Sequence, residues 1–367
     1  PIFPDSCGQF SYYWARLLSI EVRMMNSDWK TFLEAQTDSA SESAAAQAAD
    51  AAPDPECGLL DLSHLGLIRV SGEDAETFLQ GQLSNDVREV SDSHFQMSSY
   101  CTPKGRMLAN FVLFRHAGDY LLQMPQELLP AILKRMTMFV LMSKVQVTDA
   151  SDQLVRIGVA GECAESLLKQ HFASPPANAG GVAQSGGMTL LRLASERPRF
   201  EIIGDARAMI ALWPQLAADA KVANADWWSL IDIRSGIPTV RADTVEAFVP
   251  QMVNMQLLDG VSFTKGCFTG QEVIARMKYL GKIKRRMYLA HADTDNRPLP
   301  GDEIFSASSQ SPQGAGKVVN ASLSPGGGYD LLAVLEVASA DEGDLHLQQA
   351  LGPKLQLREL PYSLEET

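Results

Sequence analysis

The way secondary-structure patterns are distributed along the chain constrains its fold more than any other feature. Between residues 57 and 283, runs typical of strands alternate with segments of helical spacing. After residue 284, short apolar runs are separated by turns rich in Gly, Pro, Asp and Ser. Evenly spaced short strands of this kind are typical of small barrels. The pattern predicts an α+β body over 57–283, followed by a C-terminal β-barrel domain over 284–367.

The body itself divides into two blocks, each a mixture of strands and helices. We expect one subdomain over residues 57–152 together with 225–283, and a second over 153–224. Thr102-Pro103-Lys104-Gly105 lies between two strand-like runs. Because Pro fixes one turn dihedral and Gly tolerates positive φ, this segment predicts a β-hairpin. Ser71-Gly72-Glu73-Asp74 resembles a capping box that opens a helix.

The N-terminal part of the chain has a different composition. Residues 34–56 are dominated by Ala and Ser and carry acidic but no basic side chains. Such a segment buries too little apolar surface to offset its ordering entropy, so we expect a flexible linker, with an Ala-rich helix as the alternative. Residues 1–56 are therefore expected to be a disordered or over-extended tail. Met25 offers a more natural start, and the folded part is expected to begin near Cys57.

The bulk properties exclude several classes of protein. The formal net charge of −13 opposes a general affinity for nucleic acid or anionic membranes. No apolar stretch reaches the roughly 18–20 residues of a membrane-spanning helix. The five cysteines include no C-x-x-C pair, and the six histidines are scattered. We therefore expect a reducing compartment, the cytoplasm, with neither a disulfide framework nor a metal site.

Cys267 stands out as a candidate reactive group. It precedes a helix that is predicted to begin at Gln271, and Lys265 lies two residues before it. A positive helix end and an ammonium group both stabilise a thiolate, which makes a cysteine reactive. In the alternative interpretation, Cys267 is a small buried filler.

The residues around Cys267 add to this candidate site. Gly266 and Gly270 permit an irregular backbone, or simply form a turn. Free amides at the start of the helix could instead receive the carboxylate of a ligand. Glu272 and Arg276 are four residues apart, so they share one helix face and could form an ion pair.

The pattern K-G-C-F-T-G-Q-E over residues 265–272 is similar to the signature of the YgfZ family. These proteins are relatives of the T-protein, the aminomethyltransferase of the glycine cleavage system. Three further segments resemble the family in the same order, and the likeness covers about residues 57–367. They are F-L-Q-G-Q-L at 78–83, T-P-K-G-R at 102–106 and P-Y-S-L-E-E at 361–366.

The resemblance implies a fold, a cofactor and a role. The fold is a three-domain GcvT-like ring around a central channel that binds tetrahydrofolate or a derivative. Family members act in the assembly or repair of iron–sulfur clusters and support client enzymes that thiolate tRNA, such as a tRNA methylthiotransferase. No membrane partner and no direct contact with tRNA are expected. Cys267 occupies the position of a cysteine required for activity in the family, and Lys265 is assigned with it. The residues expected to bind the cofactor are Trp228, Gly266, Gly270, Gln271, Glu272 and Arg276.

Two departures from related patterns bear on this interpretation. Where the T-protein carries paired acids that assist methylene transfer, this chain has Ala109 and Asn110, and neither can act as a carboxylate base. Some relatives carry a second tryptophan at the position of Leu65. Trp228 could stack on a pterin ring, or it could be a core aromatic residue.

Three functions stay open at this point. The first is a folate-dependent accessory protein without classical turnover, and the second is an aminomethyltransferase-type one-carbon transferase. The third is an interaction scaffold that has lost the ligand. The basic residues between Arg276 and Arg286 could attract a folate tail, an acidic partner or tRNA, or they could simply be solvated.

Overall fold

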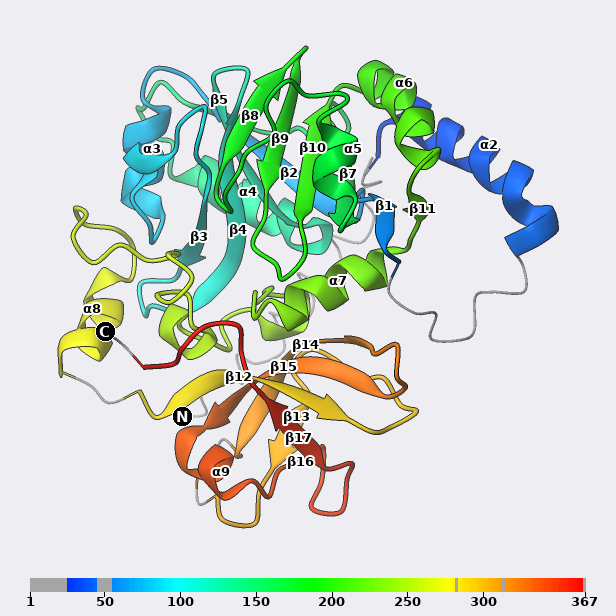
Figure 1. Cartoon of the computed structure of the whole chain (residues 1–367). Helices are drawn as coiled ribbons and strands as arrows, with labels where there is room; N and C mark the ends of the chain where they lie inside the picture. Colours follow the sequence, from blue (N-terminus) through cyan, green and yellow to red (C-terminus); the bar gives the residue numbers. More distant parts are fainter. Residues whose placement is uncertain (1–24, 45–54, 281–282, 310, 312–313, 366–367) are drawn as a thin grey trace, which may run out of the picture.

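Three sheets, built mainly from antiparallel neighbours, organise the chain (Figure 1). The structure, a computed structural model, describes residues 25–44, 55–280, 283–309, 311 and 314–365. Two of the sheets form the body and the third forms the C-terminal domain. The expected α+β class with a β-rich C-terminal part is confirmed.

The first sheet has the strand order β3-β4-β5-β2-β6. Its strands are β2 (Leu65–Ser71), β3 (Gln96–Cys101), β4 (Met107–His116), β5 (Asp119–Pro125) and β6 (Gln146–Asp149). Its helices are α3 (Ala75–Gln82) and α4 (Leu129–Met138), and the short helices η2 (Val87–Glu89) and η3 (Gln126–Leu128) lie in its connections. The predicted hairpin forms between β3 and β4, where the Gly105 N–H donates to the Thr102 carbonyl at 2.8 Å. The predicted capping box is wrong, because the Asp74 carboxylate accepts from the Lys144 N–H and not from the first turn of α3.

The second sheet has the order β11-β1-β7-β10-β9-β8. Its strands are β1 (Cys57–Asp61), β7 (Val155–Gly161), β8 (Val182–Ser185), β9 (Met188–Arg192), β10 (Arg199–Gly204) and β11 (Lys221–Val222). Helices α5 (Ala164–Leu168) and α6 (Ala206–Ala217) belong to this part of the chain. The sequence places residues 57–61 with the first block, whereas β1 pairs with β7 of the second, Cys57 opposite Gly161. The first sheet is thus inserted between two adjacent strands of the second.

The N-terminal segment departs most from expectation. Helix α2 spans Ser27–Ala44, so the predicted flexible linker is wrong for residues 34–44, and the alternative of a helix is correct there. The folded part also begins earlier than Cys57. Trp29 is fully buried against Trp213 of α6, and its indole N–H donates to the Asp61 carboxylate at 2.8 Å. Residues 1–24 and 45–54 lie outside the described part of the chain.

A disulfide joins Cys57, at the start of β1, to Cys163, just before α5. The prediction that the chain has no disulfide framework is therefore wrong for this pair. Spacing could not reveal the bond, because the two cysteines are 106 residues apart and meet only through the pairing of β1 with β7.

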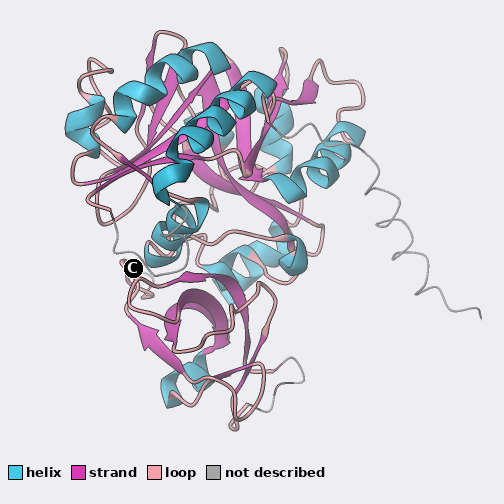
Figure 2. Cartoon of the chain, turned by 90° about the vertical axis from the view of Figure 1, so that its right-hand side faces the viewer, coloured by secondary structure: helices cyan, strands magenta, loops and turns pink. Residues whose placement is uncertain are grey.

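The C-terminal sheet has the order β16-β13-β14-β15-β12-β17 and curls into a half-barrel (Figure 2). Its strands are β12 (Arg285–Ala292), β13 (Glu303–Phe305), β14 (Gly316–Leu323), β15 (Tyr329–Glu336), β16 (His346–Leu347) and β17 (Leu355–Arg358), with α9 (Val337–Glu342) after β15. Its two edges meet at a bridge between His346 and Lys354.

Helix α7 (Ala225–Arg234) lies between the body and this domain and contacts β14 and β15 (Figure 1). Two short helices, η4 (Ala242–Thr244) and η5 (Pro250–Val253), follow it before the signature segment and α8 (Gln271–Leu280). An apolar cluster that includes Phe111, Phe248, Met287 and Val334 runs from the first sheet into the C-terminal domain. The domains therefore share a core at this junction.

Candidate functional site

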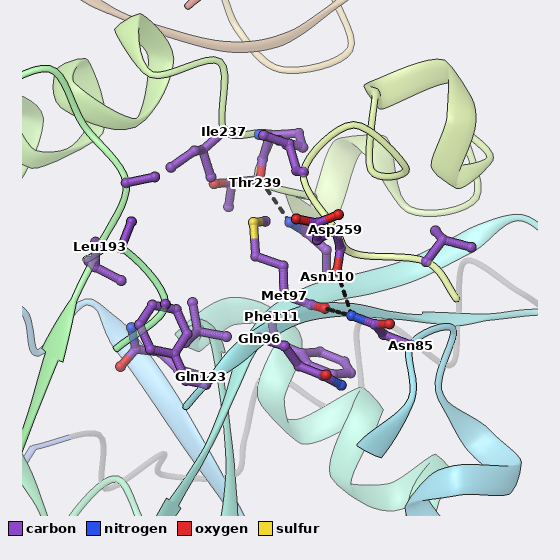
Figure 3. A pocket seen from close by; sticks show the side chains of 18 of the residues that line it. Asn85, Gln96, Met97, Asn110, Phe111, Gln123, Leu193, Ile237, Thr239 and Asp259 are labelled. Atoms are coloured by element: carbon purple, nitrogen blue, oxygen red, sulfur yellow. Dashed lines mark hydrogen bonds between the residues drawn. The ribbon is translucent and has the colours of Figure 1, made fainter. Parts of the chain in front are cut away.

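A cavity of about 710 Å³ lies between the two sheets of the body (Figure 3). Its walls come from β3, β4, β5 and the start of β10, from α7, and from the segments 237–239 and 257–264. No described residue of the C-terminal sheet lines it. The volume falls within the roughly 300–1,000 Å³ that is typical of pockets for small ligands and cofactors.

Trp228 forms part of the cavity wall and part of the core. Its side chain is 2% exposed, and a Cβ atom on Gly158 would come within 2.5 Å of its ring, so glycine is what allows this close packing. The Arg199 guanidinium lies 4.1 Å from the ring centroid, and its Nη2 forms an ion pair with the Asp232 carboxylate. Trp228 is thus a core aromatic residue that also lines the cavity, and Arg199 already lies over its ring. Stacking of this ring on a pterin stays a prediction.

Amide side chains give the cavity wall unused hydrogen-bonding capacity. Neither the nitrogen nor the oxygen of the Gln96 amide has a hydrogen-bond partner, although the residue is 6% exposed. Gln123 donates from Nε2 to the Glu201 carboxylate at 2.8 Å, and its Oε1 has no partner. Burial raises the pKa of Glu201 to about 7. Buried polar atoms without partners cost free energy, so this wall is suited to a ligand with both donors and acceptors.

Asn110 lines the same cavity (Figure 3), and both ends of its amide are hydrogen-bonded. Its Nδ2 donates to the Pro238 carbonyl at 2.7 Å, and its Oδ1 accepts from the Val240 N–H at 2.8 Å. The side chain thereby fixes the segment that follows α7 against β4. Ala109, beside it, is fully buried. This position holds a structural amide in place of an acid.

Lys265 anchors the signature segment to α3. Its ammonium group donates to the carbonyls of Gln80, Leu83 and Asn85 at 2.7–2.8 Å, and the residue is 5% exposed. Burial lowers its pKa to about 8. A lysine has three N–H donors, and all three are used here. Any stabilisation of the Cys267 thiolate by Lys265 would therefore act through charge and not through a hydrogen bond, and it stays a prediction.

Cys267 is exposed, so the alternative in which it fills a buried gap is wrong. The two glycines beside it differ in their surroundings. A Cβ on Gly270 would lie 2.6 Å from the Thr102 carbonyl oxygen, and its φ is +86°, so the residue packs against the hairpin turn as only glycine can. A Cβ on Gly266 would meet no atom within 4 Å.

The remaining predicted ligand-binding residues lie on α8. Gln271 begins the helix, and its Nε2 donates to the Gly266 carbonyl at 3.5 Å. Glu272 and Arg276 are both exposed, and the described ion pairs do not include one between them. Of the residues predicted to bind the cofactor, all of which are described, Trp228 alone lines the cavity.

The structure also brings to the cavity Phe263 and Thr264, which precede the signature and were not predicted to bind the cofactor. Lys278 of α8, one of the basic residues that could attract a folate tail, lines the cavity too and lies 4.0 Å from the centroid of the Phe263 ring. Arg199 and its strand neighbour Glu201 are charged residues within an otherwise apolar, fully buried strand. That pattern was a usable signal, because buried charges mark either an ion pair or a functional site.

Other site types find no support within the described residues. They contain no group of three or more His, Cys, Asp or Glu side chains that could hold a metal ion. No described helix is both long and apolar enough to cross a membrane.

The comparisons with known proteins agree with the signature. Residues 24–180 match the GCVT N-terminal domain family. The tRNA-modifying protein YgfZ of Colwellia psychrerythraea is 35% identical over 251 residues, which is 68% of this chain and 76% of the relative. The protein of the same name from Cronobacter sakazakii is 32% identical over 310 residues, covering 84% and 94%. The chain belongs to the YgfZ family.

A solved structure supports the fold assigned to this YgfZ family member. The glycine cleavage system aminomethyltransferase T from Bartonella henselae aligns with a TM-score of 0.65 at 18% identity, covering 83% of this chain and 86% of that one. At this identity the likeness concerns the fold alone. The expected family and the GcvT-like fold are both confirmed.

Proposed function

We propose that this YgfZ family member is a folate-binding accessory protein that supports iron–sulfur enzymes, including those that modify tRNA. The observation that carries the proposal is the cavity between the two body sheets. Its volume suits a cofactor, and its walls combine an aromatic ring, a guanidinium group and unsatisfied amides. The curated relatives are named tRNA-modifying proteins, which supports a role in tRNA modification.

The lining residues fit a reduced folate chemically. A pterin edge presents both donors and acceptors, which matches the free amide atoms of Gln96 and the free Oε1 of Gln123. Two nitrogens of the Arg199 guanidinium, Nε and Nη1, have no hydrogen-bond partner, which suits a carboxylate or a ring carbonyl. A bound tetrahydrofolate would supply one-carbon carrier chemistry. The residues of this chain would bind it, orient it and exclude water from it.

Aminomethyl transfer, the alternative function, is not favoured by the residues. The acid that would assist such a transfer has no counterpart at Ala109 or at Asn110, whose amide is already engaged on both sides. The proposed role is therefore binding without classical turnover. The proposed compartment is the cytoplasm.

The functional thiol is assigned to Cys267, outside the folate cavity. An exposed cysteine that precedes a helix is accessible to a client enzyme, and Cys267 is not among the residues that line the cavity. We propose that folate occupancy and thiol chemistry are performed at two separate places on the molecule, with the signature segment between them. Lys265 holds this segment in position through its hydrogen bonds to the carbonyls at the end of α3.

Two measurements test the proposal. Titration calorimetry with tetrahydrofolate should show binding that Trp228→Leu weakens about tenfold, because aromatic stacking and packing are lost. Trp227→Leu is the matched control, since this neighbouring ring does not line the cavity. If the native protein does not bind tetrahydrofolate, the folate part of the proposal is wrong.

The role in tRNA modification is tested in cells. A bacterial strain without its own YgfZ-type gene should regain tRNA methylthiolation with the native protein and not with Cys267→Ser at equal expression. Thr269→Ala, in the same segment, controls for disturbance of the loop. Equal recovery by the native and Cys267→Ser proteins would remove Cys267 from the functional assignment. No recovery by the native protein would refute the accessory role.

A further inference from the structure

A second cavity lies where the body meets the C-terminal sheet. It has a volume of about 440 Å³ and is bounded by the β3–β4 turn, the segment 246–252 and strands β12 to β15. The described residues that line it are all different from those that line the cavity between the body sheets. Clefts at domain boundaries are preferred places for ligand binding. The folate proposal makes no use of this cavity.

Four cations converge on this cavity from three separate elements, in a chain of net charge −13. Lys104 and Arg106 come from the T-P-K-G-R turn, Arg285 from β12 and Lys317 from β14. The sequence singles out this turn, and the folate cavity uses neither of its cations. Like charges that converge on one hollow raise the potential there and favour an anion.

The cations are only partly neutralised by the protein. Arg285 pairs with Glu336 at 3.3 Å, and Arg106 donates to the Ala247 carbonyl at 2.7 Å. In the described part of the chain, Lys104 and Lys317 form neither an ion pair nor a side-chain hydrogen bond. Two ammonium groups are thus available to a ligand.

The rest of the lining narrows the ligand class. Two carboxylates, Glu246 and Glu303, also reach the cavity, and Glu303 lies opposite Lys317 in the β13–β14 ladder. Carboxylates accept hydrogen bonds from hydroxyl groups, so this lining suits a ligand that carries hydroxyls as well as a negative group. Phe248, Met252 and Val334 supply an apolar wall. A matching ligand carries a negative group, hydroxyls and an apolar face.

We infer that this cavity binds a nucleoside phosphate, either free or as one unit of an RNA chain. The phosphate is held by Lys104 and Lys317 with help from Arg106 and Arg285. The ribose hydroxyls face the two carboxylates, and the base packs on the apolar wall. A cavity of this volume accommodates a single nucleotide.

The position of the cavity connects it to the signature segment. A Cβ on Gly105 would lie 3.1 Å from the Val273 side chain of α8, and Gly270 packs against the Thr102 carbonyl. The turn that carries Lys104 and Arg106 is therefore in direct contact with the helix that follows Cys267. A bound nucleotide would be held beside the element that presents the thiol.

Binding of AMP and of a short single-stranded RNA to the full chain, each without folate, tests the inference. At low salt we expect the native protein to bind at least one of them. The double variant Lys104→Gln/Lys317→Gln should weaken that binding roughly tenfold or more, because two charge-assisted contacts are lost. The matched control is Lys134→Gln/Lys221→Gln, which removes the same charge at exposed lysines that line neither cavity.

Each outcome decides the matter. Binding of AMP that the cavity variant weakens assigns the site to a free nucleotide. Binding of RNA alone, with the same sensitivity and a steep dependence on salt, assigns it to a nucleotide within RNA. The inference is overturned if neither probe binds, or if the cavity and control variants weaken binding equally. Because all four substitutions replace surface cations, thermal unfolding should verify that both variants remain folded.

Discussion

Replacement of Lys265 by methionine separates an anchoring role from a chemical one. The substitution keeps the length of the side chain but removes the three hydrogen bonds to the carbonyls of Gln80, Leu83 and Asn85. Each buried acceptor left unsatisfied costs about 1–3 kcal/mol, or roughly 3–9 kcal/mol in total. Relief of the buried charge and entry of water offset part of this cost. The net loss in the free energy of unfolding is expected to be about 2–4 kcal/mol.

This loss corresponds to a measurable change in melting temperature. At about 2.1 cal/mol/K of unfolding entropy per residue, roughly 330 described residues give about 0.7 kcal/mol/K, so Tm should fall by about 3–6 °C. Thermal unfolding followed by circular dichroism measures the shift. Lys134→Met, at an exposed position on α4, controls for the loss of a charge and should change Tm by less than about 1 °C. An unchanged Tm for Lys265→Met, combined with lost tRNA methylthiolation, would refute the anchor and support a chemical role.

Three further predictions concern other parts of the molecule. Gly270→Ala should destabilise the protein by about 1–3 kcal/mol, because of its positive φ and the contact with the hairpin, whereas Gly266→Ala should be neutral or slightly stabilising in urea unfolding. The raised pKa of Glu201 means that the folded state binds this proton more tightly than the unfolded chain. Its contribution to the free energy of unfolding is therefore fully present below about pH 4.5 and is lost as the pH rises to about 7. Glu201→Gln should remove this part of the pH dependence of stability, as measured by urea unfolding. Trp29→Ala should cost about 3–5 kcal/mol and increase proteolysis of α2, and no loss of stability would contradict the packing of this helix on the body.

The sequence predicted the elements of the body well because their local patterns are strong. The T-P-K-G turn and the helix that begins at Gln271 each carry their own local signal in the sequence. The family followed from an eight-residue motif and its supporting segments. These predictions needed no knowledge of which elements become neighbours.

The missed features all depend on long-range pairing. The Cys57–Cys163 bond requires the register of β1 on β7, and the cavity wall gathers Gln96, Gln123 and Arg199 from three separate strands. Helix α2 was not predicted because composition does not show that Trp29 is buried, and this burial holds the helix against the second sheet. Tertiary contacts thus overrode a weak local preference.

The predicted site was also only partly localised. The sequence grouped Trp228 with the residues of the signature segment, but the described structure brings only the former to the cavity wall. A motif indicates that its residues share a function, but it does not show that they contact the same ligand. That Cys267 lies outside the cavity could be seen only in three dimensions.

The insertion of the first sheet between β1 and β7 has a consequence for how the chain folds during synthesis. The hydrogen-bonding partner of Cys57 in the second sheet is Gly161, so β1 emerges from the ribosome roughly 100 residues before β7 does. At about 5–20 residues per second, this leaves several seconds in which β1 is an unpaired strand edge. The first sheet, whose strands all lie between residues 65 and 149, can assemble in that interval. Co-translational folding should therefore begin with the inserted first sheet, and the second sheet should be completed only after the first sheet has folded.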